Sequence, residues 1–194
     1  MSGIYDPKAS DAAFLKALES LRDCLLPDRR FPTNVFRDSW SSFYFFDSDS
    51  IFEPEFVTIV NSLLTAEGGV YACVVNLDQL PLENRRSVFF VNPDVTTTEY
   101  GVFLRGREIE EGWIYGMDRF ACISNLTHWC IYCEKANEIA VIALRDKGSL
   151  QKLTEALSHL GGLPIAQGIS APPSYGLSAR ALSLDWRHQL LRYY

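Results

Sequence analysis

The sequence predicts an α+β fold in a single domain over residues 1–194, with a mainly antiparallel sheet of about five to seven strands and about four packed helices. Three observations lead to this prediction. Residues 112–144 are rich in β-branched and aromatic residues and are interrupted by short turn sequences. Amphipathic helical patterns occur on both sides of this stretch. The chain has 194 residues, 47% of them hydrophobic, which is enough to bury a core without disulfides or metals.

Four helices are expected where apolar residues recur at helical spacing between capping and stopping residues. In the first helix, Ser10 or Asp11 is the expected cap, and Pro27 ends the pattern. In the second, Pro54 lies in the first turn and Gly68-Gly69 follow the end. The Gly/Pro-rich residues 163–173 are predicted to form a loop. The predicted helices span residues 11–26, 54–66, 150–160 and 178–192.

The strands of the central stretch are separated by turns at Asp118, Asn125 and Asn137, whose side chains can bond their own backbone. Loops this short make neighbouring strands antiparallel. Residues 138–144 are apolar on both faces, which is typical of an interior strand. Residues 95–99 either extend the sheet or form a loop. The predicted strands span residues 40–46, 70–77, 88–92, 100–105, 113–116, 120–124, 128–134 and 138–144.

No motif in the sequence predicts a catalytic residue, a metal site or a cofactor. The five cysteines are an odd number in apolar surroundings, so we expect reduced, mostly buried thiols. Cys130 and Cys133 form a CxxC pair, but they are three apart in a predicted strand and therefore face opposite sides. A Cys–His pair or a carboxylate pair assembled by the fold stays open as the basis of an alternative function, a cytoplasmic hydrolase.

The charge of the chain is unevenly distributed. Between Asp47 and Asp118 there are 13 acidic residues and four arginines, which gives a net charge of −9 in a chain of net charge −6. An acidic surface repels nucleic acid and attracts a basic protein. No apolar segment is long enough for a membrane helix, and residues 1–11 lack a secretory signal pattern, so the expected location is the cytoplasm.

Three segments carry a resemblance to the small acidic immunity proteins of bacterial polymorphic and contact-dependent toxin systems. They are Gly112-Trp-Ile-Tyr-Gly116, His128-Trp-Cys-Ile-Tyr-Cys-Glu134 and Glu138-Ile-Ala-Val-Ile-Ala-Leu144. The resemblance implies a non-enzymatic protein that binds a cognate toxin domain and occludes its active site or substrate entrance.

From charge and position in the sequence, we expect the partner-binding residues to be Asp47, Asp49, Glu108, Glu110 and Glu111, with Trp113 or Tyr44 as aromatic anchors. The aromatic run 40–46 has aromatic side chains on both faces, which favours a strand buried on two sides over a strand with one face exposed for binding. An adaptor or scaffold subunit is the other alternative function, and the sequence leaves the oligomeric state open.

Overall fold

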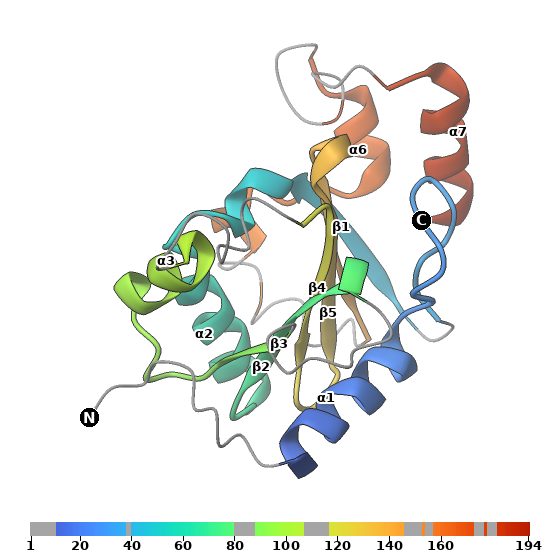
Figure 1. The fold of residues 1–194 in the computed structure, drawn as a ribbon. Coiled ribbons are helices and arrows are strands. Elements are labelled where there is room, and N and C mark those ends of the chain that lie inside the picture. The colour runs from blue at the N-terminus through green and yellow to red at the C-terminus, as the bar shows by residue number, and fades with distance from the viewer. Residues whose placement is uncertain are drawn as a thin grey trace.

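The described chain is organised around a six-stranded antiparallel sheet with the strand order β1-β6-β5-β4-β2-β3 (Figure 1). The computed structural model describes residues 11–37, 40–79, 88–106, 117–145, 153, 157–172, 177 and 182–194. The predicted antiparallel α+β fold is confirmed. The strands are β1 (Ser42–Asp47), β2 (Ala72–Asn76), β3 (Val88–Val91), β4 (Arg119–Ser124), β5 (Trp129–Glu134) and β6 (Ile139–Leu144).

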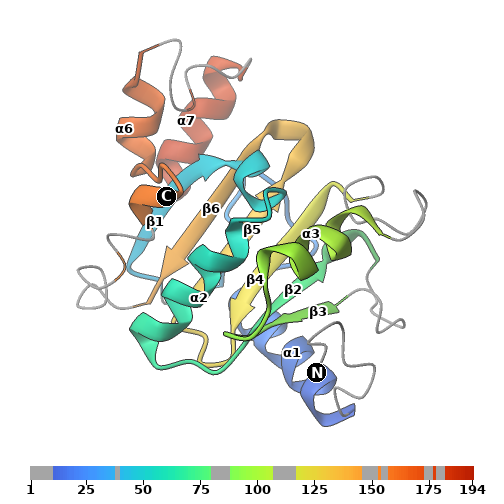
Figure 2. The same ribbon diagram turned by 90° about the vertical axis from the view of Figure 1, so that its left-hand side faces the viewer.

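Helices lie on both faces of this sheet (Figures 1 and 2). The α-helices are α1 (Asp11–Cys24), α2 (Phe56–Glu67), α3 (Thr97–Arg105), α6 (Ile165–Ser170) and α7 (Leu184–Tyr193). Short 3-10 helices follow three strands: η1 (Ser48–Ile51), η2 (Leu77–Gln79) and η4 (Lys135–Asn137). No helix in the described ranges is long and apolar enough to cross a membrane.

The alternation of side chains along the strands produces two apolar layers. In β5, Trp129, Ile131 and Cys133 pack with α2 and α3 on one face, while Cys130 and Tyr132 pack on the other. The second face is covered by α1, the loop after α1, α6 and α7. As predicted, Cys130 and Cys133 therefore lie in different layers, and all five cysteines are free and buried.

The strand β6 lies between β1 and β5, and each of its six residues is buried, as its double-sided apolar pattern predicts. The neighbouring β1 is the edge strand on this side. At its centre, Phe45 exchanges two backbone hydrogen bonds with Leu163, of 2.7 and 2.9 Å. This pairing covers part of an edge that would otherwise offer free backbone groups to another chain.

Two predictions of local structure are wrong. Residues 100–105 are not a strand, because Thr96 and Glu99 form a capping box that starts α3 and directs Tyr100 and Leu104 into the core. The predicted loop 163–173 contains the short helix α6. The predicted strand 113–116 and most of the predicted helix 150–160 lie outside the described residues.

Candidate functional site

Antiparallel pairing brings acidic side chains from four segments to one end of the sheet. Asp47 at the end of β1 and Glu134 at the end of β5 both pair in register with Ile139, and Glu134 also pairs with Arg119 at the start of β4. Asp78 follows β2 at the same end, since Asn76 pairs with Phe120. We name this group the acidic end; it consists of Asp47, Asp49, Asp78, Asp118, Glu134 and Glu138.

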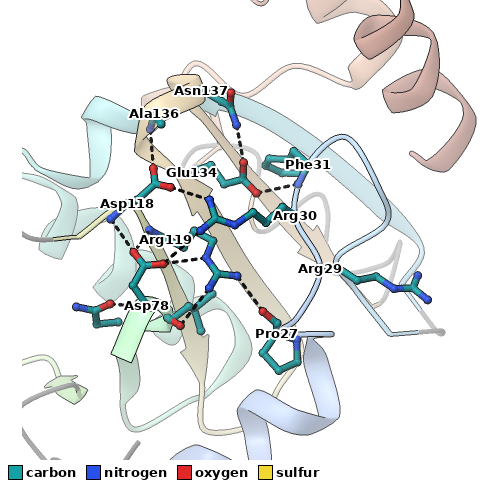
Figure 3. Close-up of polar contacts among 12 residues, drawn as sticks. Pro27, Arg29, Arg30, Phe31, Asp78, Asp118, Arg119, Glu134, Ala136 and Asn137 are labelled. Carbon is teal, nitrogen blue, oxygen red and sulfur yellow. Dashed lines mark hydrogen bonds and ion pairs between the residues drawn. The ribbon is translucent and has the colours of Figure 1, made fainter. Parts of the chain in front are cut away.

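Asp78 accepts three hydrogen bonds at the acidic end (Figure 3). One oxygen accepts hydrogen bonds from the backbone N–H groups of Asp118 and Arg119, both at 2.8 Å, and the other accepts one from the Arg119 guanidinium at 2.9 Å. Burial alone would raise the pKa of Asp78, but the hydrogen bonds from Arg119 and Asp118 outweigh it and hold the pKa below its usual value. This carboxylate is therefore ionised and fixed in position.

Two arginines connect the acidic end to the segment after α1. Arg119 is mostly buried and donates a 2.9 Å hydrogen bond to the carbonyl of Pro27. Arg30 is 53% exposed; its guanidinium donates to Asp118 at 2.9 Å and lies 3.8 Å from Asp78. The other oxygen of Asp118 accepts the backbone N–H of Ala136 at 2.8 Å. The carboxylates of Asp78 and Asp118 are thus held by guanidinium and backbone donors together.

Glu134 is the buried member of the acidic end, with 1% of its surface exposed. Its Oε1 accepts the backbone N–H of Phe31 at 2.8 Å, and its Oε2 accepts the side-chain amide of Asn137 at 2.5 Å (Figure 3). The hydroxyl of Tyr132 also donates to Oε1, at 2.6 Å. The Phe31 ring packs edge-on against Tyr132 with centroids 5.0 Å apart. Glu134 therefore anchors the segment after α1 to the sheet and is enclosed by its donors.

The outer rim of the acidic end is formed by Asp47, Asp49 and Glu138. Asp47 caps η1 by accepting the backbone N–H of Asp49 at 2.9 Å. The backbone of η1 meets the β5–β6 turn through a long hydrogen bond of 3.4 Å from Ser48 N–H to the carbonyl of Glu138. Asp49 and Glu138 are exposed. Among the described residues, the six carboxylates of this end lie near three cations, Arg30, Arg119 and Lys135, so this part of the surface is acidic overall.

The structure brings together two of the residues proposed from the sequence as partner-binding, Asp47 and Asp49. Tyr44, proposed as an anchor, is half-buried in β1 and packs against the core layer under α2 and α3, away from the strand end. The remaining proposed residues lie outside the described residues: Glu108, Glu110, Glu111 and Trp113. They precede Met117, the described residue that leads into β4.

The partner-binding residues expected from the sequence did not include Asp78, Asp118 or Glu134, nor the two arginines that hold Asp78 and Asp118. A partial signal existed, because a strand beginning after Asp118 and an antiparallel neighbour ending at Glu134 must meet at one end of the sheet. The pairing of β2 with β4 carries no such local signal, since the two strands are more than 40 residues apart in the chain.

The described residues contain no group of three or more His, Cys, Asp or Glu side chains arranged to hold a metal ion. Burial raises the pKa of four thiols, those of Cys73, Cys122, Cys130 and Cys133, which opposes thiolate chemistry at these positions. No protein-family model, curated protein or solved structure matches this chain. Function is therefore inferred from the chemistry of the acidic end.

Proposed function

We propose that this protein is a non-enzymatic binding protein that neutralises a cognate bacterial toxin by direct contact, with the acidic end as the contact surface. The observation that carries the proposal is the gathering of six carboxylates, from four segments of the chain, at one end of a rigid sheet. Basic proteins are attracted to such a surface from a distance, which accelerates association.

The arrangement of the carboxylates supports a protein partner. Asp78 and Asp118 are fixed by backbone N–H groups and arginines, so ordering them on binding carries little further entropy cost. Asp49 and Glu138 are exposed on the rim, where a partner's lysine or arginine can reach them. The proposal also includes Glu108, Glu110, Glu111 and Trp113, whose contribution is inferred from the sequence.

The test is affinity capture of the tagged protein from its native host, with washes at low and then high salt and identification of retained proteins by mass spectrometry. We expect one basic protein, retained at low salt and released at high salt, that is toxic when produced alone. Co-production of the present protein should suppress that toxicity.

A charge-reversal pair then locates the contact. Asp49→Lys combined with Glu138→Lys should slow association with the captured protein by about tenfold or more at low salt. The matched control reverses the same number of charges elsewhere: Asp94→Lys after β3, at the opposite end of the sheet, and Glu19→Lys on α1, both exposed. If the association rate falls equally in the two double variants, or does not fall in the first, binding through the acidic end is contradicted.

A further inference from the structure

Glu67 places a carboxyl group in the interior at the opposite end of the sheet from the acidic end. Glu67 is the last residue of α2, and its side chain is 2% exposed. Its Oε2 accepts the hydroxyl of Ser124 at 3.0 Å, and Nδ1 of His128 lies 3.8 Å from the same oxygen. A carboxylate at a helix C-terminus also faces the negative end of the helix dipole, which disfavours its ionisation.

The second oxygen of this carboxyl group makes no hydrogen bond within the described part of the chain, although the Trp129 indole and the His128 backbone N–H lie near the carboxyl group and lower its pKa. Oε1 of Glu67 and the indole N–H of Trp129 are both buried, and neither has a hydrogen-bond partner within the described part of the chain. The backbone of Gly69 lies close to this carboxyl group, since a Cβ atom added to Gly69 would be only 2.6 Å from Oε1 of Glu67. Since the side chain is enclosed and incompletely bonded, a negative charge there is poorly stabilised.

Among the residues that the structure describes, the ionisable groups around Glu67 include no lysine or arginine paired with it. His128, which is 53% exposed, is the basic side chain within 4 Å among the described residues. From β4, the thiol of Cys122 faces the carboxyl group and is affected by its charge. Arg145 is directed elsewhere, donating to the carbonyl of Thr127 at 2.7 Å and stacking on Trp40 at 4.7 Å. Neutralising the charge of Glu67 therefore requires a proton, which binds either to the carboxyl group itself or to His128.

Two turns meet around this group. Gly68 ends α2 in the left-handed conformation, and Gly69 returns a hydrogen bond to Leu64 at 2.8 Å. The following residue, Val70, donates its N–H to the side chain of Asn125 at 2.9 Å, which joins the α2–β2 turn to the β4–β5 turn. These turns also carry two exposed apolar side chains, Val70 at 67% and Leu126 at 40%.

We propose that Glu67 is a pH-sensitive switch that holds the α2–β2 and β4–β5 turns together when its carboxyl group is protonated and loosens them when it ionises. Burial raises the pKa of Glu67 from 4.5 to about 7, and the Ser124 hydroxyl, the Trp129 indole and the His128 backbone N–H limit the rise. The change therefore falls near neutral pH. It alters how Val70 and Leu126 are presented, and it is independent of the function proposed for the acidic end.

The test is a pH titration of the ¹⁵N-labelled full-length protein by NMR between pH 5.5 and 8.5. The indole N–H of Trp129 and the amides of Val70 and Leu126 should shift together with one midpoint near pH 7. Amide exchange at Val70, corrected for its intrinsic pH dependence, should accelerate above this midpoint as its bond to Asn125 opens more often. Glu67→Gln should abolish the shared transition.

Two further variants separate Glu67 from its neighbours. Ser124→Ala should move the midpoint to higher pH, because it removes a hydrogen bond that favours the carboxylate. His128→Gln should leave a transition in place, since the proposed switch is the carboxyl group of Glu67. A transition that survives in Glu67→Gln, vanishes in His128→Gln, or is absent from the wild-type protein overturns the proposal. If Glu67→Gln does not fold, the Ser124→Ala variant tests the proposal instead: a midpoint that moves to higher pH supports it, and one that does not move to higher pH overturns it.

Discussion

Replacing Glu134 by alanine should destabilise the protein by about 3–5 kcal/mol, because three donors lose their acceptor at once. Two of them, the backbone N–H of Phe31 and the hydroxyl of Tyr132, are in buried hydrogen bonds, and the amide of Asn137 is partly buried. A buried donor left without a partner costs about 1–3 kcal/mol. Removing the buried charge of Glu134 offsets part of this cost. The expected loss of stability is therefore smaller than the sum of the costs for the three donors.

The variant should still fold, since the Phe31 ring remains packed among aromatic side chains. Its ring contacts Tyr132, Phe45, Trp186 and Tyr194 at centroid distances between 5.0 and 6.3 Å. Urea unfolding at pH 7, followed by circular dichroism, measures the change in free energy from the midpoint at constant slope.

Conservative variants distinguish lost acceptors from lost charge. Glu134→Gln retains an oxygen for Phe31 and Tyr132, and Tyr132→Phe removes one donor, so each should cost about 1–2 kcal/mol. Glu55→Ala, at an exposed position without a side-chain cap bond, is the control and should change stability by less than about 0.5 kcal/mol. A loss below about 1 kcal/mol for Glu134→Ala, or equal losses for the alanine and glutamine variants, refutes the reasoning.

Three more predictions concern single positions, each measured by urea unfolding. Thr96→Ala should cost about 1 kcal/mol by removing the capping box with Glu99, and an unchanged midpoint would contradict the box. Glu138→Gly should stabilise by up to about 1 kcal/mol, because Glu138 has a φ of 55°; destabilisation would contradict this. In the wild type, Glu67 should lower the stability by roughly 3 kcal/mol at most as the pH rises from 4.5 to about 7. Glu67→Gln should remove this pH dependence, and an unaltered pH profile in the variant would contradict the prediction.

The sign of the last prediction follows from where the proton binds. The folded state holds a proton on Glu67 up to about pH 7, whereas the unfolded chain releases it near 4.5. Between these values the folded state binds more protons than the unfolded state, so raising the pH favours unfolding. Comparing wild type and Glu67→Gln at pH 5 and at pH 8 isolates this contribution from other titrating groups.

The strands from Arg119 to Leu144 could be predicted from the sequence because their alternation and short turns are local signals. The misassignment of residues 100–105 shows where composition fails: Tyr-Gly-Val-Phe-Leu is compatible with a strand, and the helix is decided by Thr96 and Glu99 just upstream. That capping pair was visible in the sequence, and giving it more weight than β propensity would have identified α3.

The candidate sites depend on pairings that the sequence does not encode locally. Asp78 reaches Arg119 because β2 inserts between β3 and β4, and Glu67 reaches Ser124 because α2 ends beside the last residue of β4. Neither contact follows from periodicity or charge counting. The sequence indicated that carboxylates matter in this chain, but not which of them are exposed, fixed or buried.

Two buried or half-buried carboxyl groups illustrate why that distinction matters for function. Asp78 receives three strong donors, so its pKa lies below the usual value and its charge persists across the physiological range. Glu67 is buried, and the effect of burial outweighs the hydrogen bond from Ser124, so its pKa rises to about 7. Attraction of a basic partner to the acidic end should therefore change little between pH 6 and 8, whereas the opposite end of the sheet responds within that interval. If the two ends act separately, Glu67→Gln should leave the affinity for the partner unchanged at pH 6 and at pH 8.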